Sequence, residues 1–378
     1  MIRVLTIVGA RPQFIKAGPV SRALREVGIS EFLVHTGQHY DPQMSDVFFA
    51  ELGIPEPDLN LKVGSGSHGA QTGAMLAGIE RSIVEQKPDW VLVYGDTNST
   101  LAGALAAAKL HVPVGHVEAG LRSFNRRMPE EINRIVSDTL ATILFVPTEV
   151  GRQNLLREGV SADRICWTGD VMYDAMLMFQ ERAAKRSSVL PRLGLDDSPY
   201  VLATVHRAEN TDDPVRLEAI IEGLRNVAET HRVILPLHPR TRARIKDLPR
   251  LETKRLEIIE PVGFLDMIRL EMAARVIATD SGGVQKEAFF HRVPCVTLRN
   301  ETEWTELVDL GWNRVIPPLN AASIAGAVRD ACGTLGAPGN PFGDGHAAER
   351  IAEALRAHSG RSPLEVGSPS RQTTRMQE

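Results

Sequence analysis

Two acidic side chains follow apolar runs in the first half of the chain, where a carboxylate can act as an acid or a base. Asp96 comes one residue after the run Trp90–Tyr94, and Glu118 directly follows the run Val112–Val117. A carboxylate at the end of a buried strand is costly unless it has a partner or a function. Both are therefore candidate proton-transfer groups.

Glu130 and Glu131 extend this acidic set, because they follow Pro129 only a few residues further on. One carboxylate of such a set can remove a proton while another donates one. Structural roles stay open for three of the four groups. Asp96 can cap the helix expected after it, and Glu130 or Glu131 can stabilise a helix N-terminus. Glu118 has no such alternative.

A segment near the start of the chain can bind an anion. In Gly9–Lys16, the glycine lets the backbone approach a ligand, and Arg11 and Lys16 can meet a phosphate at a helix N-terminus. An ordinary turn between a strand and a helix is an equally good interpretation. The segment lacks the G-x-G-x-x-G pattern, which argues against a dinucleotide cofactor.

The most informative binding pattern lies in the second half of the chain. Ser281, Gly282 and Gly283 follow the run Ala274–Thr279 almost directly and open a helix. Their backbone N–H groups form a compact nest suited to a diphosphate. Glu287, on the first turns of the same helix, can accept both hydroxyls of a ribose. A Ser-Gly-Gly segment alone is a common helix start, and its pairing with Glu287 makes it informative.

The elements that must position these side chains alternate between strands and helices. Most of the apolar runs are apolar on both faces, as parallel strands covered by helices on each side must be. The alternation predicts βαβ units, in which ligands bind beyond the carboxyl ends of the strands. His206 stands at such an end. The expected strands are Arg3–Val8, Phe32–Thr36, Trp90–Tyr94, Val112–Val117, Ile143–Val146, Tyr200–Val205, Arg232–Leu237, Leu256–Ile259, Ala274–Thr279 and Pro294–Leu298, and expected helices include Thr100–Leu110, Glu131–Leu140, Pro214–Thr230 and Val284–Phe290.

The 378-residue chain exceeds the usual size of one hydrophobic core, so we expect two α/β domains with doubly wound parallel sheets. The run of strands pauses at 181–199. The expected N-terminal Rossmann-like domain covers 1–170 and is completed by a C-terminal helix at 346–358. The second covers 171–345. The polar tail 359–378 lacks periodicity, and we expect it to be disordered.

Composition and charge narrow the class of protein. The formal net charge of −4 gives no support to a nucleic-acid or membrane-surface partner. Cys166, Cys295 and Cys332 are few and widely separated, so neither a disulfide framework nor a metal site is expected. No apolar stretch approaches the roughly 20 residues of a membrane span, and no signal peptide is visible. We expect a cytoplasmic protein.

In order, these segments resemble the non-hydrolysing UDP-N-acetylglucosamine 2-epimerase family. The resemblance runs from Arg3 to about Ile351 and implies a glycosyltransferase-B-type architecture, with a cleft between two Rossmann-like domains. It also implies a UDP-sugar substrate, a homodimer, and a reaction without a cofactor or a metal. The matching motifs are Gly9–Lys16, Gly95–Thr100, His116–Ser123, Pro129–Arg134, His206–Asn210, Asp280–Glu287 and Asn340–Gly345.

The resemblance also assigns roles to the candidate residues. Phe264 is expected at the uracil, the Ser281–Gly283 nest at the diphosphate, and Glu287 at the ribose. Asp96, Glu118 and Glu130 are the expected acid/base set, assisted by His206. The other expected substrate-binding residues are Arg11, Lys16, Arg122 and Glu131.

Two departures from the family pattern affect the expected substrate and regulation. The usual Thr-Glu-Arg-Pro-Glu segment reads Thr302–Glu306 here, with Trp304 in place of the arginine. This variant resembles the subgroup that acts on the 2,3-diacetamido uronic acid form of UDP-GlcNAc. Bacterial members also carry an activator-site arginine that is replaced near Ala74, although Gln38 and His39 of that site are kept.

UDP-GlcNAc 2-epimerisation is the expected activity, with epimerisation of the diacetamido glucuronate as the alternative. Three further functions stay open. A retaining glycosyltransferase can use the same scaffold, since fold alone does not define function. A hydrolysing epimerase differs only in whether water reaches the intermediate. A non-catalytic nucleotide-sugar binding protein would not need the buried Glu118.

Overall fold

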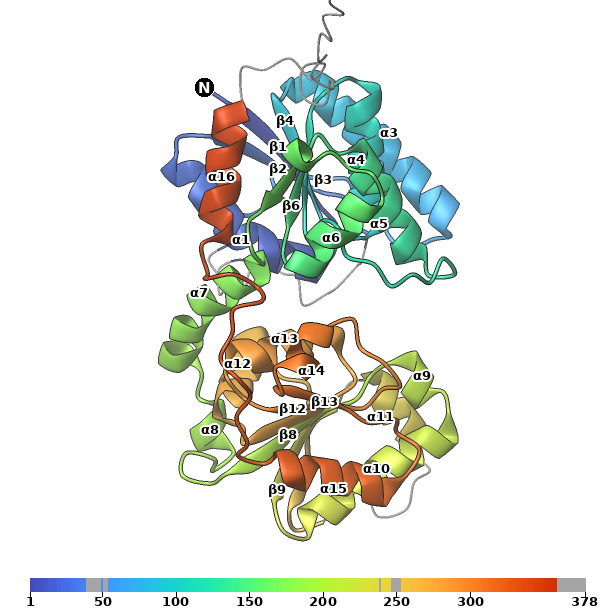
Figure 1. Cartoon of the computed structure of the whole chain (residues 1–378), viewed down its shortest axis with the longest axis vertical. Helices are drawn as coiled ribbons and strands as arrows, with labels where there is room; N and C mark the ends of the chain where they lie inside the picture. The colour runs from blue at the N-terminus through green and yellow to red at the C-terminus, as the bar shows by residue number, and fades with distance from the viewer. Residues whose placement is uncertain (39–48, 50–53, 238, 246–252, 359–378) are drawn as a thin grey trace, which may run out of the picture. The chain divides into compact units, whose positions relative to one another are not determined.

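The computed structural model describes the chain except residues 39–48, 50–53, 238, 246–252 and 359–378. The predicted disordered tail and His39 therefore lie outside the described residues. The chain divides into two compact units (Figure 1). Unit 1 comprises residues 1–175 and 341–378, and unit 2 comprises residues 176–340. Helix α7 (Val171–Arg186) contains the point at which the chain passes from unit 1 to unit 2.

Among the described residues, unit 1 is built on a seven-stranded parallel sheet with the strand order β3-β2-β1-β4-β5-β6-β7. The central strands are short, β-branched and buried on both faces, as parallel strands between helices must be. The strands are β1 (Arg3–Val8), β2 (Ser30–His35), β3 (Leu59–Asn60), β4 (Trp90–Tyr94), β5 (Val114–Val117), β6 (Ile143–Val146) and β7 (Ile165–Trp167).

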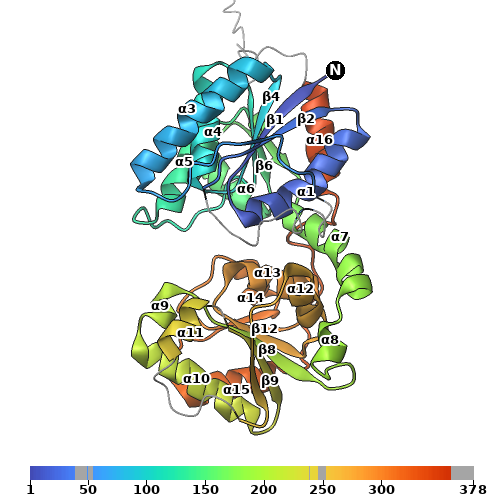
Figure 2. The ribbon, with the colours of Figure 1, turned by 180° about the vertical axis from the view of Figure 1, so that it is seen from behind.

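Helices cover both faces of this sheet. On one face, α1 (Arg11–Glu26) lies beside α16 (Ala347–His358), and on the other face lie α3 (His68–Gln86) and α4 (Asn98–Lys109), as Figures 1 and 2 show. The apolar faces of α3 and α4 share one core with Ile7 of the sheet. Further helices in the described part of the unit are α5 (Pro129–Leu140), α6 (Glu149–Arg157) and the short η1 (Ala162–Arg164).

Unit 2 repeats the same design with a six-stranded parallel sheet of order β10-β9-β8-β11-β12-β13, counted over its described residues. The strands are β8 (Tyr200–Thr204), β9 (Arg232–Pro236), β10 (Leu256–Ile259), β11 (Val276–Thr279), β12 (Cys295–Thr297) and β13 (Asn313–Val315). One core contains Val201 and Val276 with side chains of α10 (Pro214–Ala228) and α15 (Ala321–Ala331).

The opposite face of the second sheet carries the helices that matter most for the site. There α12 (Phe264–Ala273) and α13 (Gly282–Phe290) pack together over Leu202 and Ile277 (Figure 1). The short α8 (Val189–Arg192) packs beside α12. Within the described residues of this unit, the other short helices are α9 (Ala208–Thr211), α11 (Pro239–Ile245) and α14 (Thr305–Asp309).

The predicted fold class, two Rossmann-like doubly wound parallel sheets, is confirmed. In both sheets the strand order reverses direction at one place, between β1 and β4 in unit 1 and between β8 and β11 in unit 2. Ligands of doubly wound sheets bind beyond the carboxyl ends of the strands at this switch point. No helix within the described residues combines the length and the apolarity that a membrane crossing requires.

Candidate active site

The switch point of unit 1 brings together the loops that follow β1 and β4. Gln13, in the first turn of α1, joins them. Its Oε1 accepts hydrogen bonds from the Gly9 and Ala10 amides at 2.7 and 3.1 Å. Its Nε2 donates to the carbonyl of Tyr94 at 2.7 Å. A buried amide that satisfies groups on both loops fixes their spacing, so Gln13 positions the segments that carry Arg11 and Asp96.

Glu118 lies where the sequence placed it, just beyond β5, with only 10% of its side chain exposed. It forms an ion pair with Lys16 of α1. The φ angle of Glu118 is +68°, a left-handed conformation that costs roughly 1–2 kcal/mol for a residue with a side chain. A Cβ added to Gly95 would lie 3.2 Å from Glu118 Oε2. The Gly95 turn therefore leaves space for this carboxylate.

Asp96 is bonded to Arg134 of α5 through an Oδ2–Nη2 contact of 2.5 Å. Burial raises the pKa of Asp96, although the guanidinium of Arg134 opposes that effect. The helix that follows is capped by Thr97, whose hydroxyl accepts a hydrogen bond from the Thr100 amide. The capping role left open for Asp96 is therefore wrong, and its carboxyl is held by a cation.

A buried charge network lies beneath these two loops. His116 of β5 is fully buried, with Nδ1 2.7 Å from Asp138 Oδ1 and Nε2 2.7 Å from the Gly95 carbonyl. Both partners are acceptors, so the ring must donate from both nitrogens and carry a positive charge. Burial favours the neutral ring, but Asp138 outweighs it and raises the pKa of His116. Asp138 also pairs with Arg122 at 2.7 Å.

Arg122 and Glu131 are both occupied by contacts within unit 1. The Arg122 side chain is 1% exposed and also pairs with Glu158 at 2.7 Å. Glu131 accepts hydrogen bonds from the Ser123 and Phe124 amides at 2.9 and 3.0 Å. These contacts hold the loop between β5 and α5, and contact of either residue with a substrate stays a prediction.

Two other predicted residues of unit 1 lie at helix starts near the carboxyl edge of the sheet. Glu130 is exposed on the first turn of α5. Arg11 is the first residue of α1 and is half-buried, directly after the Gly9–Ala10 turn. The structure thus places Arg11, Lys16, Asp96 and Glu118 on loops or helix starts around one switch point.

In unit 2, the predicted diphosphate nest forms the start of α13. The Ser281 hydroxyl accepts a hydrogen bond from the Val284 amide at 3.4 Å and caps the helix. The first-turn amides of Gly282 and Gly283 have no acceptor within the helix, because a helix leaves its first N–H groups unpaired. Such amides, with the positive end of the helix dipole, favour an anion.

Trp304, the departure from the family pattern, contacts this nest directly. Its Nε1 donates to the Gly282 carbonyl at 2.9 Å. Lys286 Nζ lies 4.3 Å from the centre of the Trp304 ring, a cation–π contact. The neighbouring Glu303 is close enough that a Cβ on Gly282 would lie 2.3 Å from its Oε1. The nest is therefore shaped by Trp304 and Glu303 as well as by its own glycines.

His206 is held at the same switch point by a buried aspartate. The Asp280 carboxylate is fully buried and accepts hydrogen bonds from the amides of His206 and Arg207 at 3.1 and 3.0 Å. Asn210 donates to it at 3.1 Å. The His206 side chain is 41% exposed, with Nδ1 3.5 Å from Asp280 Oδ1. Asp280 thus fixes the loop after β8 beside the nest after β11.

The two remaining predicted nucleotide contacts lie on α12 and α13. Phe264 opens α12, with its ring edge-on to Phe179 at 5.4 Å between centroids. Glu287 lies on α13, two turns from the nest, and burial together with Glu271 raises the pKa of its carboxyl. Both residues are within one unit with Ser281, as a nucleotide site requires.

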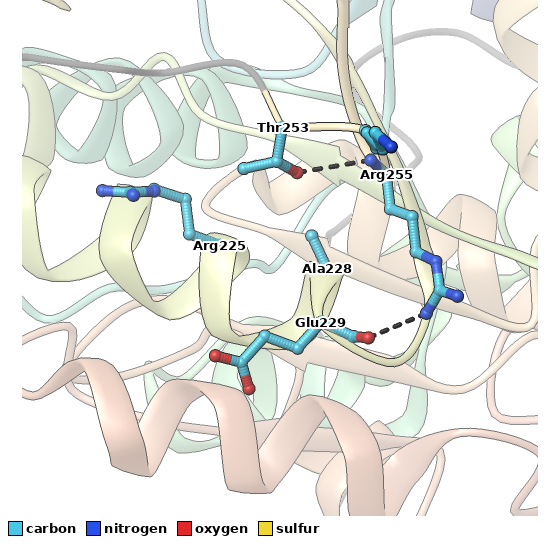
Figure 3. A pocket seen from close by; sticks show the side chains of 6 residues that line it. Arg225, Ala228, Glu229, Thr253 and Arg255 are labelled. Carbon is cyan, nitrogen blue, oxygen red and sulfur yellow. Dashed lines mark hydrogen bonds between the residues drawn. The ribbon is translucent and has the colours of Figure 1, made fainter.

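Among the described residues, no three His, Cys, Asp or Glu side chains form a group that could hold a metal ion. A surface pocket of about 230 Å³ lies at the opposite edge of the second sheet, where Thr253, Lys254 and Arg255 precede β10 (Figure 3). Parallel strands have their amino ends at one edge and their carboxyl ends at the other, so this pocket is separate from the switch point. Arg255 there donates to the Glu229 carbonyl at 2.7 Å.

Two doubly wound parallel sheets, each with its candidate groups at the switch point, define a protein of the glycosyltransferase-B type. The family model described as UDP-N-acetylglucosamine 2-epimerase matches residues 22–356. The chain belongs to the UDP-N-acetylglucosamine 2-epimerase family, which confirms the predicted resemblance.

Individual relatives cover nearly the whole chain. The UDP-2,3-diacetamido-2,3-dideoxy-D-glucuronate 2-epimerase of Pseudomonas aeruginosa is 52% identical over 94% of this chain and 99% of its own length. The crystal structure of the Methanocaldococcus jannaschii UDP-GlcNAc 2-epimerase in complex with UDP-GlcNAc and UDP has a TM-score of 0.84 at 44% identity, covering 94% of this chain and 100% of that one. The Neisseria meningitidis enzyme bound to UDP-GlcNAc has the same TM-score at 31% identity, with 94% and 100% coverage.

Several residues that build the site were not among the predicted site residues. Gln13, His116, Arg134 and Asp280 all stood inside the quoted motifs, so motif position was a usable signal for them. Asp138 stood outside every motif. Asp138 is an acidic residue on a helix beside a buried sheet. The sequence alone does not show whether such a residue is buried or exposed to solvent.

Proposed function

We propose that this protein is a non-hydrolysing UDP-sugar 2-epimerase that interconverts UDP-GlcNAc and UDP-ManNAc. The observation that carries the proposal is the pairing of a Ser-Gly-Gly helix start with Glu287 in unit 2 and a carboxylate set with cationic partners in unit 1. Membership of the epimerase family supports the same activity. In this proposal Ser281–Gly283 hold the diphosphate, Glu287 the ribose and Phe264 the uracil.

The reaction begins with anti elimination. A carboxylate removes the proton at carbon 2 while the bond between carbon 1 and the UDP oxygen breaks, and UDP leaves with the electron pair as a 2-acetamidoglucal forms. Because the carbon 2 proton is weakly acidic, stabilisation of the leaving diphosphate by the nest and nearby cations must assist this step. Protonation on the other face and re-addition of UDP complete a net isomerisation without a change in oxidation state.

Asp96, Glu118 and Glu130 are the proposed acid/base set. Two protonation events on opposite faces require more than one such group. Burial raises the pKa of Asp96 above its ordinary value, which makes its carboxyl a better proton acceptor than an ordinary aspartate. Arg11, Lys16 and His206 supply the cationic or hydrogen-bonding groups at the sugar and phosphates.

Epimerisation of the UDP-diacetamido glucuronate is the second candidate activity. Trp304 stands where the family usually has an arginine and bonds the nest at Gly282. The 52% identity to the Pseudomonas aeruginosa enzyme supports the same substrate. Incubation with each UDP-sugar separately, followed by proton NMR of the products, tests both. An epimer formed from neither substrate, or free sugar released in place of the UDP-linked epimer, would contradict the proposal.

A homodimer and a cytoplasmic location belong to the same proposal: the resemblance supports the first, and the few, widely separated cysteines support the second. Multi-angle light scattering of the purified chain tests the first. A molar mass near twice 41.4 kDa is expected. A mass near 41.4 kDa at all protein concentrations would rule out the homodimer.

A further inference from the structure

Arg207 places a guanidinium beside the proposed diphosphate nest, and the reaction described above does not use it. The residue directly precedes α9, and its backbone amide donates to the buried Asp280 at 3.0 Å. A Cβ added to Gly282, the first residue of α13, would lie 3.6 Å from Nη2 of Arg207. The main chain of Arg207 is therefore fixed by Asp280, and its side chain lies at the start of the helix that carries the nest.

The side chain of Arg207 is held only weakly. Among the described residues, its guanidinium has one ion pair, between Nη2 and Glu303 Oε1 at 4.0 Å, and donates no hydrogen bond. The two side chains are 33% and 37% exposed. An ion pair of this length that is open to solvent contributes little to stability. Arg207 can therefore exchange Glu303 for another anion at small cost.

Glu303 does not depend on Arg207 to balance its charge. Its Oε2 accepts a hydrogen bond from Nη1 of Arg299 at 2.7 Å. Burial acts to raise the pKa of Glu303, but the charge of Arg299, helped by that of Arg207, outweighs burial and lowers the pKa. Arg299 itself is buried and also pairs with Glu209 at 3.5 Å. Of the two arginines beside Glu303, Arg207 is thus the one that a ligand can recruit.

The proposed elimination creates a charge for which such a cation is suited. When the bond between carbon 1 and the β-phosphate oxygen breaks, the electron pair passes to that oxygen, and the β-phosphate gains one negative charge. The base takes the proton from carbon 2. A guanidinium carries a full charge and can donate two parallel hydrogen bonds to a phosphate. A group that binds this phosphate more strongly after the bond has broken lowers the barrier.

We propose that Arg207 is a further catalytic residue, whose guanidinium moves from Glu303 to the β-phosphate and stabilises UDP as it leaves. The inference rests on the proposed function, in which the Ser281–Gly283 nest holds the diphosphate. In the return step the same contact holds UDP until it adds again to carbon 1. Arg207 therefore acts on the charge that develops during the reaction, beside a nest that binds the diphosphate throughout.

Arg207→Gln tests this role, because it removes the charge and keeps the backbone contact with Asp280. The rate of epimerisation should fall by about 10²–10³-fold, the usual loss for one donor to a developing charge. At about pH 8, where the terminal phosphate of UDP is fully ionised, affinity for UDP should fall about tenfold more than affinity for UDP-GlcNAc. Initial rates and calorimetry measure these quantities. A purely structural side chain would affect both affinities alike, so their ratio reports the added charge.

Arg225→Gln is the matched control. The Arg225 side chain is also 33% exposed and pairs with a glutamate, Glu222, at 2.9 Å, but it lines the pocket at the opposite edge of the same sheet (Figure 3). Its replacement should leave the rate and both affinities unchanged. An Arg207→Gln chain as active as this control, or with equal losses of affinity for UDP and UDP-GlcNAc, would overturn the inference. Arg207→Met carries the same comparison if Arg207→Gln does not fold.

The wild-type chain separates this inference from the proposed function. The rates are measured with whichever of the two UDP-sugars the wild type epimerises. If it epimerises neither, the result contradicts the proposed function itself. If it epimerises one of them and Arg207→Gln does so at the same rate, only the role of Arg207 is removed.

Discussion

At the residue scale, Glu118 combines three features that a purely structural acid does not need. It is nearly buried, it pairs with Lys16, and its backbone is in the left-handed region. Strained backbone persists only where its surroundings over-determine it, and it gathers at functional sites. These features support Glu118 as a member of the acid/base set.

Glu118→Gln should lower the rate of epimerisation by about 10²–10⁴-fold, because it removes a proton-transfer group but keeps the size of the side chain. UDP affinity should change much less than the rate, since the groups proposed for the uracil, the ribose and the diphosphate nest lie in unit 2. Initial rates and calorimetry measure the two quantities. The control is Glu149→Gln, an exposed acid paired with Arg152 on α6. A Glu118→Gln chain that is as active as the control would remove Glu118 from the reaction.

His116 makes a second prediction at this scale. Its raised pKa means that the folded chain holds the His116 proton more tightly than the unfolded chain. The resulting stability is fully present below about pH 6.5, the ordinary histidine value, and is lost as pH rises through the folded pKa. Urea unfolding across pH should show this alkaline decline in the wild type and a smaller one in His116→Asn. Equal declines in both chains would mean that His116 is not a buried cation.

At the element scale, the loop after β5 is fixed by close contact with α6. Gly120 has a φ of +80°, and a Cβ there would lie 2.5 Å from the Gly151 carbonyl oxygen. The backbone of α6 cannot yield as a flexible side chain can. The site loop and α6 therefore behave as one packed element.

Gly120→Ala should lower the free energy of unfolding by about 1–3 kcal/mol more than Gly159→Ala, the cost of overpacking. Gly159 is a matched control because its φ is +83° but no atom lies within 4 Å of its added Cβ. Both variants thus share the cost of the left-handed backbone, and the difference reports the contact with Gly151. Equal losses in the two variants, measured by urea unfolding, would show that Gly120 tolerates a side chain.

The central strands could be predicted from the sequence because they are continuous apolar runs. Arg3–Val8, Trp90–Tyr94, Ile143–Val146 and Leu256–Ile259 agree with β1, β4, β6 and β10 at both ends. The other expected strands begin and end within two residues of the observed strands. Three short strands, β3, β7 and β13, were missing from the prediction. All three lie toward the sheet edges and have only two or three residues, too few for a periodic pattern.

The partners within the site could not be predicted in the same way. Asp96 and Glu118 follow two consecutive expected strands, and in the structure these strands, β4 and β5, pair with each other. The pairing of Glu118 with Lys16 and of Asp96 with Arg134 depends on how α1 and α5 pack on the sheet. Such packing couples residues 102 and 38 positions apart in sequence, which local patterns do not report.

At the scale of the whole molecule, the chain returns to unit 1 at residue 341, and α16 belongs to this returning segment. Ile351 and Leu355 of this helix are fully buried, and α16 lies beside α1 (Figure 2). Burial of such side chains contributes about 1.5–3 kcal/mol each. Because a domain is stable by only about 5–15 kcal/mol, unit 1 should depend on this helix.

A chain that ends at residue 346 should therefore lose cooperative unfolding of unit 1, and its thermal transition should broaden or disappear. A chain that ends at residue 358 keeps α16 and should unfold as the full-length protein does. Circular dichroism during heating measures both. If the chain ending at 346 unfolds at the full-length temperature, α16 is not part of the unit 1 core.

Because the net charge is −4, the chain must bind an anion through local geometry rather than through its overall charge. The groups proposed to bind the anion lie at the two switch points. The proposed function depends on proton transfer at carbon 2 of a UDP-sugar. Its most direct test is proton NMR of UDP-GlcNAc, and separately of the diacetamido glucuronate, incubated with the protein in deuterated water. We expect deuterium at carbon 2 with the UDP linkage retained. Turnover to a free sugar without deuterium at carbon 2 would contradict it.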